Sequence, residues 1–418
     1  MNPERIITGL DIGSAKTTVV IAEAVGEKKN APRLKILGVG QARTTGLRRG
    51  VVSDIEETTR SIKKAIEDAE RMAGTKVDTL YAGIAGEHVR AMISKGIVAV
   101  NGEEISKADV DRANDVARAQ PVPQDRELLH AIPQEYSVDK NQGIRDPIGM
   151  IGTRLETEMY LVTIGASPAM NLRKSVERAG YRVRELVLEP LASALAVLTE
   201  DEKELGVALV EMGAGTTDIA VFHEGKIRHL GTVNFGGNNV TSDIVQGMGV
   251  TQADAERLKE RYGCAYEPLV DPSDIIQLPS TVAQGERHIP REVLAHIIHQ
   301  RMDEIFNLVL SEIERAGFAQ RLNGGVVISG GAAAMQGVAE LAADVFGTGV
   351  RIGSPAENIS GLSDSVDAPR FATVVGLALY GAHRSAAGFT PSGRHRALAG
   401  AGVDRFTRRI KSWLEDFF

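Results

Sequence analysis

Two acidic residues each end an apolar run and precede a turn of small residues. Asp11 lies in the run that begins at Arg5, and Glu211 lies in the run that begins at Leu205. Small residues let backbone N–H groups approach an anion closely, which makes a concave nest for phosphate. A carboxylate beside such a nest can face a hydrated Mg²⁺, which keeps several of its waters. The two segments therefore predict a site for nucleotide phosphates and a magnesium ion.

The two acidic segments align without a gap at an offset of 200 residues. Residues 5–22 read RIITGLDIGSAKTTVVIA, and residues 205–222 read LGVALVEMGAGTTDIAVF. Short apolar runs on both sides of a small-residue turn predict a β-hairpin. Two unrelated hairpins would give the same shape, but the acid at the same turn position favours a common functional origin. We expect two similar domains that grip the phosphates between them.

A third turn comes later in the chain. Residues 326–329 form a short apolar strand, Gly330 and Gly331 follow it, and residues 332–343 have the pattern of a helix. Glycines at a strand-to-helix turn allow a flat group such as a nucleobase to lie on the backbone. Such a turn is more often only a turn, but its position after the two hairpins favours a role in the same site.

The composition excludes several classes of protein. The 418 residues are 43% hydrophobic and 25% charged, as in globular proteins, and this length predicts two to three domains. The single cysteine, Cys264, permits no intramolecular disulfide and no cysteine metal cage. The net charge of −7 argues against nucleic acid as the main partner, since phosphate binding needs a basic face. We expect a soluble protein of a reducing compartment.

Five segments, in this order, resemble the motifs of the actin and heat-shock-chaperone ATPase superfamily. They are GLDIGSAKTT (9–18), LEPLASA (188–194), EMGAGTTD (211–218), ISGGAA (328–333) and ATVVGLA (372–378). They look like its phosphate-1, connect-1, phosphate-2, adenosine and connect-2 motifs. Within this superfamily the chain resembles the FtsA family of bacterial cell-division proteins. The segments that carry this resemblance are YAGIAG (81–86), GIRDPIGM (143–150), VTSDI (240–244), DAERLKERYGCA (254–265) and RIGSP (351–355).

The resemblance implies ATP and Mg²⁺ as ligands. It places Asp11, Glu189 and Glu211 around the metal and the attacking water, with Asp11 and Glu211 holding Mg²⁺ through water. The residues that it implies for nucleotide binding are Gly13, Ser14, Ala15, Lys16, Gly213, Gly215, Thr216, Thr217, Gly236, Gly237, Glu256, Lys259, Gly330, Gly331 and Ala332. From spacing alone, Glu256 and Lys259 would be a surface ion pair on one helix face.

The sequence departs from the superfamily pattern at two positions. Glu211 stands where Asp is usual, and Ala214 stands where Gly is usual. One extra methylene moves the carboxylate and could misplace the water shell of the metal. We therefore expect nucleotide binding with slow ATP hydrolysis at most.

The fold class that follows is α/β, an actin-like two-domain ATPase fold with duplicated phosphate-binding hairpins and an inserted small α+β domain. The first domain is expected at 1–80, 164–194 and 365–383, with the inserted domain at 81–163. The second domain is expected at 195–225 and 290–364, with a subdomain at 226–289. Inside the insertion, Ser106 is expected to cap a helix that runs to about Ala119, and β-rich segments follow at 127–138 and 154–164.

A helix is expected at about 291–311, and it carries Arg301 and Glu304. These two residues would ordinarily be solvent-facing charges. In the FtsA family the corresponding helix binds the short C-terminal tail of FtsZ, a peptide with charges of both signs. The resemblance therefore implies Arg301 and Glu304 as residues that contact this partner.

The end of the chain differs chemically from the rest. Residues 384–418 hold seven Lys or Arg against three Asp or Glu. Residues 384–402 are expected to be a flexible linker, and 403–418 an amphipathic helix too short and too charged to span a bilayer. Such a helix either lies on a membrane or docks in a protein groove, and its aromatic and basic content favours an anionic membrane. Its apolar side chains are Phe406, Ile410, Trp413, Leu414 and Phe417.

The function implied is a nucleotide-dependent protein that forms filaments with itself and tethers FtsZ filaments to the membrane. Its place would be the cytoplasmic face of the inner membrane at the division septum, where it recruits later divisome proteins. One alternative is the actin-like platform protein of type IV pili, but the terminal amphipathic helix argues against it. Another is a superfamily enzyme such as a sugar kinase, which has no use for that helix.

Overall fold

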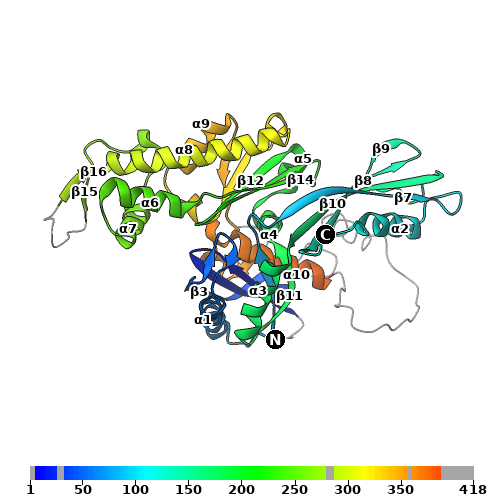
Figure 1. Cartoon of the computed structure of the whole chain (residues 1–418), viewed down its shortest axis with the longest axis horizontal. Helices are drawn as coiled ribbons and strands as arrows, with labels where there is room; N and C mark the ends of the chain where they lie inside the picture. The colour runs from blue at the N-terminus through cyan, green and yellow to red at the C-terminus, as the bar shows by residue number, and fades with distance from the viewer. Residues whose placement is uncertain (1–4, 26–32, 279–286, 356–358, 387–418) are drawn as a thin grey trace.

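A computed structural model describes residues 5–25, 33–278, 287–355 and 359–386 (Figure 1). The linker and helix expected at 384–402 and 403–418 therefore lie outside the described residues, apart from residues 384–386. Across the described ranges, no helix combines the length and the apolar character needed to cross a bilayer.

The first domain is built on a six-stranded sheet with the strand order β11-β6-β1-β2-β3-β19. One face is covered by α1 (Ile55–Ala73) and α3 (Ala166–Arg178), and the other by α10 (Ala372–Ala386). Helix α1 starts where the Asp54 side chain accepts from the N–H of Glu57, and it ends at Gly74 with a φ of 65°. The strands are β1 (Ile6–Ile12), β2 (Lys16–Val25), β3 (Arg33–Arg43), β6 (Thr79–Ile84), β11 (Arg182–Leu188) and β19 (Ile359–Gly361).

The second domain repeats this plan with a five-stranded sheet of order β14-β13-β12-β17-β18. Its strands are β12 (Val207–Met212), β13 (Thr217–His223), β14 (Lys226–Val233), β17 (Val326–Ser329) and β18 (Val350–Ile352). Its helices are α5 (Glu200–Leu205), α6 (Gly237–Met248), α7 (Gln252–Tyr262), α8 (Arg291–Arg315) and α9 (Val338–Phe346). Beyond them lies the small hairpin of β15 (Ile275–Leu278) and β16 (Arg287–Pro290), at the left end of Figure 1.

The inserted domain lies at the opposite end of the molecule in Figure 1. Its four strands have the order β7-β10-β8-β9, and helix α2 (Lys107–Arg118) packs on β7. Ser106 caps α2 as expected, and the β-rich segments expected here are confirmed as β8 and β10. The strands are β7 (Arg90–Ala99), β8 (Arg126–Val138), β9 (Asn141–Ile144) and β10 (Arg154–Gly165).

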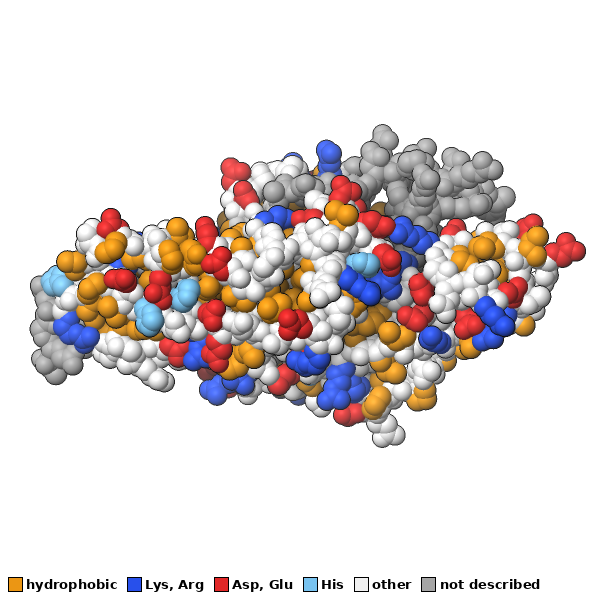
Figure 2. All heavy atoms as spheres, turned by 90° about the horizontal axis from the view of Figure 1, so that it is seen from above, with side chains coloured by type: hydrophobic (Ala, Val, Ile, Leu, Met, Phe, Trp, Pro, Cys, Tyr) orange, Lys and Arg blue, Asp and Glu red, His pale blue; other side chains and the backbone are white. Residues whose placement is uncertain are grey.

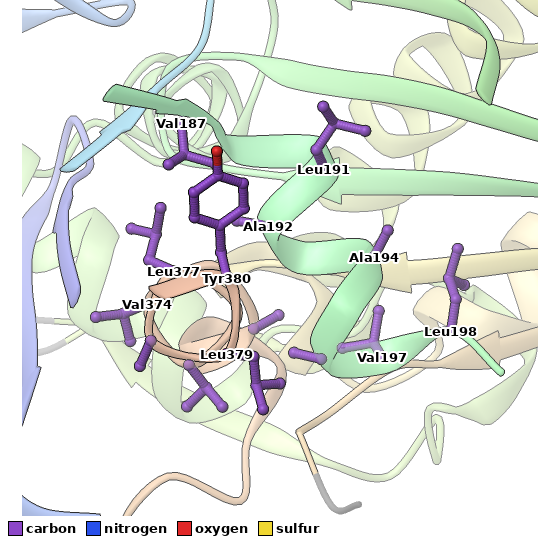
Figure 3. Close-up of a cluster of buried hydrophobic side chains, with 14 of the residues drawn as sticks. Val187, Leu191, Ala192, Ala194, Val197, Leu198, Val374, Leu377, Leu379 and Tyr380 are labelled. Atoms are coloured by element: carbon purple, nitrogen blue, oxygen red, sulfur yellow. The ribbon is translucent and has the colours of Figure 1, made fainter. Parts of the chain in front are cut away.

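Two helices cross between the domains. In Figure 3, α4 (Glu189–Val197) and α10 bring Leu191, Ala192, Val374, Leu377 and Tyr380 into one buried cluster. The crossing is close, because a Cβ built on Gly376 would lie 1.9 Å from the carbonyl oxygen of Ala192. Only glycine permits this approach of the two backbones.

The sheets include strands outside the expected boundaries. Residues 81–84, expected in the insertion, belong to β6 and pair with β1 in the first sheet. Residues 226–233, expected in the separate subdomain, form β14 beside β13. Strand β19, expected in the second domain, pairs with β3 of the first.

The prediction of one helix over residues 332–343 is wrong for the first half of this range. Residues Gly331–Ala334 form a single 3₁₀ turn, and α9 begins only at Val338. Gly337, at a φ of 81°, separates the two, and this left-handed conformation cannot continue a right-handed helix. Helix α8 extends beyond its expected end, to Arg315.

Candidate functional site

The two acidic segments form hairpins with the same backbone. In the first, the N–H of Gly13 donates to the carbonyl of Lys16 at 3.1 Å, and in the second Gly213 donates to Thr216 at 2.9 Å. The strands pair in equivalent registers, so that Asp11 is opposite Thr18 and Glu211 is opposite Asp218. The predicted duplication is confirmed at this level.

The turns of the two hairpins meet. A Cβ built on Gly215 would lie 2.9 Å from Oγ of Ser14, so a side chain there would displace the Ser14 hydroxyl. The start of α6 closes the second turn from behind, because Gly237 and Asn238 donate to the carbonyls of Gly213 and Ala214 at 3.0 and 2.8 Å. The predicted phosphate-binding residues of both hairpins are therefore brought together.

Four carboxyl groups converge beside the turns, namely Asp11, Glu189, Glu211 and Asp218. Burial, followed by the charge of Glu211, raises the pKa of Asp11 to about 7. Burial and the neighbouring acids hold the pKa of Glu189 well above its usual range. Burial raises the pKa of Glu211 to about 7 and that of Asp218 to about 6. Removing acids from water and crowding them favours protonation, which a divalent cation would reverse.

The acids differ in how they are held. Glu211 accepts from Oγ of Ser193 on α4 at 2.9 Å and from the hydroxyl of Thr373 on α10. These two hydroxyls also meet each other at 3.1 Å. Among the described residues, Asp11 has no such hydrogen-bond partner. The second acid is thus tied to the crossing helices, while the first faces the turns.

Glu189 begins α4 and packs on the first sheet. A Cβ on Gly83 would lie 2.8 Å from Cγ of Glu189, so the absence of a side chain on β6 makes room for this glutamate. Asp218, Ser193 and Thr373 were not among the predicted site residues. A hydroxyl in the otherwise apolar face of a buried helix was the signal that could have found Ser193.

Glu256 and Lys259 of α7 are not a simple surface pair. Nζ of Lys259 donates to the carbonyl of Gly237 at 3.0 Å, to Thr241 at 2.7 Å and to Glu256 at 2.8 Å. The Thr241 hydroxyl donates to Glu256 in turn. The pair is therefore fixed against the first turn of α6, at the edge of the phosphate turns.

The third turn reaches the same edge. Strand β17 lies parallel to β12, with Ser329 opposite Glu211, so the glycines that follow it emerge beside the acids. Gly330 has a φ of 90°, and a Cβ there would lie 2.5 Å from the carbonyl oxygen of Met212. Gly331 faces open space instead. A flat group can lie on this turn, and Ala332 continues its 3₁₀ segment.

The predicted partner residues are not part of the hairpins. Arg301 and Glu304 are on α8 and contact each other, and Arg301 also pairs with Asp243 of α6. The apolar residues predicted to contact a membrane, from Phe406 to Phe417, lie outside the described residues.

Solved structures with a similar fold define the class of protein. The PilM–PilN type IV pilus biogenesis complex matches 90% of this chain and 98% of that chain, with a TM-score of 0.63 and 17% identity. MreB5 of Spiroplasma citri bound to ADP matches 85% of this chain and 94% of that chain, with a TM-score of 0.52 and 16% identity. Likeness at this identity establishes the fold alone. The fold is therefore that of the actin-like proteins.

The particular family follows from the sequence matches. Residues 208–376 match the family model described as cell division protein FtsA, and residues 86–163 match the SHS2 domain inserted in FtsA. The cell division protein FtsA of Pseudomonas aeruginosa is 40% identical over 420 residues, which cover 99% of this chain and 98% of that protein. The FtsA of Neisseria meningitidis is 39% identical over 416 residues, 99% of each. The chain belongs to the FtsA family of cell division proteins, as its motifs predicted.

Proposed function

We propose that the protein binds ATP with Mg²⁺ between its two hairpins and tethers FtsZ filaments to the cytoplasmic face of the inner membrane at the septum. The observation that carries this proposal is the pair of equivalent turns, Gly13–Lys16 and Gly213–Thr216, with four acids beside them. An actin-like domain pair with this arrangement is suited to close on a nucleotide and to assemble into filaments.

The residues present fit a magnesium–nucleotide complex. Backbone N–H groups of the turns and the ammonium group of Lys16 would face the phosphates. Asp11, which has no hydrogen-bond partner among the described residues, would hold a water of the metal, and Glu211 would do so while anchored to Ser193. When bound, Mg²⁺ would neutralise charge that develops on the phosphates.

Glu189 is the residue placed to orient an attacking water. Burial and the neighbouring acids raise its pKa, which makes it a stronger base than an exposed glutamate, and its packing on Gly83 fixes its direction. The nucleoside end would contact Gly236, Glu256, Lys259 and the turn at Gly331. Because Glu211 is held by two hydroxyl groups of the crossing helices, we propose that ATP hydrolysis is slow.

The proposed partners use three further regions. Arg301 and Glu304 would contact the FtsZ tail, and residues 403–418 would lie on the anionic membrane. The inserted domain would contact other copies and other divisome proteins. Its strand β7 is an edge strand, and the side chains of Met92, Ile93 and Ile97 on it are exposed, which suits association.

A vesicle experiment with the full chain tests this function. We expect the protein to pellet with anionic vesicles and to carry FtsZ with it when ATP and Mg²⁺ are present. The fluorescence of Trp413, the only tryptophan, should shift to shorter wavelength on binding. Trp413→Glu should remain folded but stay in the supernatant, whereas Trp413→Phe should still pellet. Equal pelleting of all three proteins would contradict the membrane role of this helix.

A further inference from the structure

Three of the five N–H groups of Arg301 donate to carboxylates within the protein. Its Nε and Nη2 atoms donate to the two carboxylate oxygens of Asp243 at 2.5 and 3.1 Å, and its Nη1 atom donates to Glu304. The guanidinium carbon lies 5.6 Å from the centre of the Phe235 ring. A two-pronged pair of this kind is among the strongest side-chain hydrogen-bond arrangements. The face of Arg301 that a partner's carboxylate would use is already occupied.

The charges at this site do not favour an approaching acid. One arginine is shared by two carboxylates, so the cluster of Asp243, Arg301 and Glu304 carries a net charge of −1. The side chain of Glu304 is 50% exposed, but those of Asp243 and Arg301 are only 26% and 23% exposed. A basic group of a partner can therefore reach Glu304 directly, whereas an acidic group that pairs with both Nε and Nη2 of Arg301 must first replace Asp243.

The surface around α8 does not attract the acidic or the basic group of a partner from a distance. Figure 2 looks onto the side of the molecule that carries α8 and shows acidic and basic side chains interspersed. Recognition here must therefore depend on local pairs rather than on a field of one sign.

Asp243 belongs to the helix that begins at the phosphate turns. Helix α6 starts at Gly237, whose N–H donates to the carbonyl of Gly213. Nζ of Lys259 donates to the carbonyl of Gly237 in the first turn of the helix. Asp243 is six residues further on, about 9 Å along the helix axis. The far end of α6 packs tightly on α8, because a Cβ on Gly247 would lie 2.6 Å from Cδ1 of Ile297. A shift of α6 at the turns therefore reaches the Asp243–Arg301 pair.

We propose that Asp243 is an internal substitute for the acidic group of the partner peptide, and that the peptide must displace it from Arg301. In the peptide-free state Asp243 pairs with Arg301. In the peptide-bound state the peptide's carboxylate pairs with Arg301, and its basic group pairs with Glu304. This inference rests on the proposed function, in which Arg301 contacts the FtsZ tail. Since α6 joins both sites, nucleotide binding and peptide binding are linked, and the linkage is reciprocal.

The test measures binding of a fluorescent FtsZ C-terminal tail peptide to the full chain, with and without Mg-ATP. Asp243→Asn keeps the shape but removes the competing charge, so we expect the peptide to bind about tenfold more tightly. The nucleotide dependence of peptide affinity that the wild type shows should be lost in this variant. A peptide whose acidic residues are replaced by amides should gain nothing from Asp243→Asn.

Asp303→Asn is the matched control, because Asp303 lies on α8 and its side chain contacts Asn307 rather than Arg301. It should bind the peptide as the wild type does. If Asp243→Asn binds no more tightly than Asp303→Asn, the displacement is refuted. A wild-type affinity that does not change with Mg-ATP refutes the linkage.

Arg301→Ala separates this inference from the proposed function. Loss of peptide binding in Arg301→Ala places the tail at α8, and the result for Asp243→Asn then decides the displacement. Unchanged peptide binding in Arg301→Ala would mean that the tail binds elsewhere, and both proposals would fail together. ATP affinity and melting temperature of each variant show that the fold is retained.

Discussion

The hairpin β1–β2 and the hairpin β12–β13 have the same backbone but hold their acids differently. Asp11 has no hydrogen-bond partner in the part of the chain that the structure describes, whereas Glu211 is bound by Ser193 and Thr373. The longer side chain of glutamate reaches the crossing of α4 and α10, where both hydroxyls lie. A duplicated backbone therefore holds its two acids differently: the hydrogen bonds of Glu211 join the second turn to the helices between the domains, and Asp11 makes no such link among the described residues.

The largest difference is expected between variants of these two acids. Asp11→Asn should weaken Mg-ATP binding by roughly a hundredfold or more, because it removes a charge proposed to face the metal. It should not lower stability, because this crowded carboxyl group has no hydrogen-bond partner among the described residues. Glu211→Ala should also weaken Mg-ATP binding, but it should in addition lower the free energy of unfolding by about 2–3 kcal/mol, because two buried hydroxyls lose their acceptor. Calorimetry of binding and of unfolding measures both. Equal losses of stability in the two variants would show that Ser193 and Thr373 do not make Glu211 structurally different from Asp11.

The pH dependence of stability sharpens the comparison. The pKa values of Asp11 and Glu211 are raised to about 7 and that of Asp218 to about 6, so the folded protein binds more protons than the unfolded chain between about pH 4 and 7. Stability of the nucleotide-free protein should therefore fall as the pH rises through this window. Denaturant unfolding at pH 5 and pH 7.5 measures it.

Asp11→Asn serves as the control for this pH dependence. It should make the fall in stability smaller, because one of the raised groups no longer titrates. Stability that rises with pH in the nucleotide-free protein would contradict the crowding of these acids.

The smallest expected difference lies in the turns. The side chain of Lys16 is exposed at the first turn, whereas the Thr216 hydroxyl at the second already donates to Asp218 at 3.1 Å. Lys16→Ala should weaken ATP binding by about tenfold through loss of one charge-assisted contact. Thr216→Val should change it less, and titration with a fluorescent ATP analogue compares the two. A larger loss of ATP affinity in Thr216→Val than in Lys16→Ala would contradict the proposed contact between the Lys16 ammonium group and the phosphates.

The hairpins could be predicted because each is contained in 18 consecutive residues, with the acid, glycines and apolar runs in fixed order. The contacts of Glu211 could not, since Ser193 and Thr373 lie 18 and 162 residues away along the chain. Only the crossing of α4 and α10 brings them together. Helical spacing likewise pairs Arg301 with Glu304, but it contains no information about Asp243, which is 58 residues distant.

The broken helix after β17 shows a second limit. Residues 332–343 are mostly apolar and helix-compatible, so their pattern favours one continuous helix. Gly337 has a left-handed backbone, and its neighbours leave no room for a side chain, because a Cβ there would lie 2.7 Å from the backbone nitrogen of Tyr266. This constraint comes from a segment some 70 residues earlier, and no local pattern could indicate it.

Helix α10 has a consequence for how the protein is made. It packs on β1 and on α4, and it supplies much of the apolar cluster in Figure 3. About 360 residues separate the end of β1 from the start of α10. At 5–20 residues per second, a ribosome needs roughly 20–70 s to add them. During synthesis, the face of β1 that α10 covers therefore stays uncovered for this time. The nascent chain exposes an apolar surface until residues 372–386 emerge.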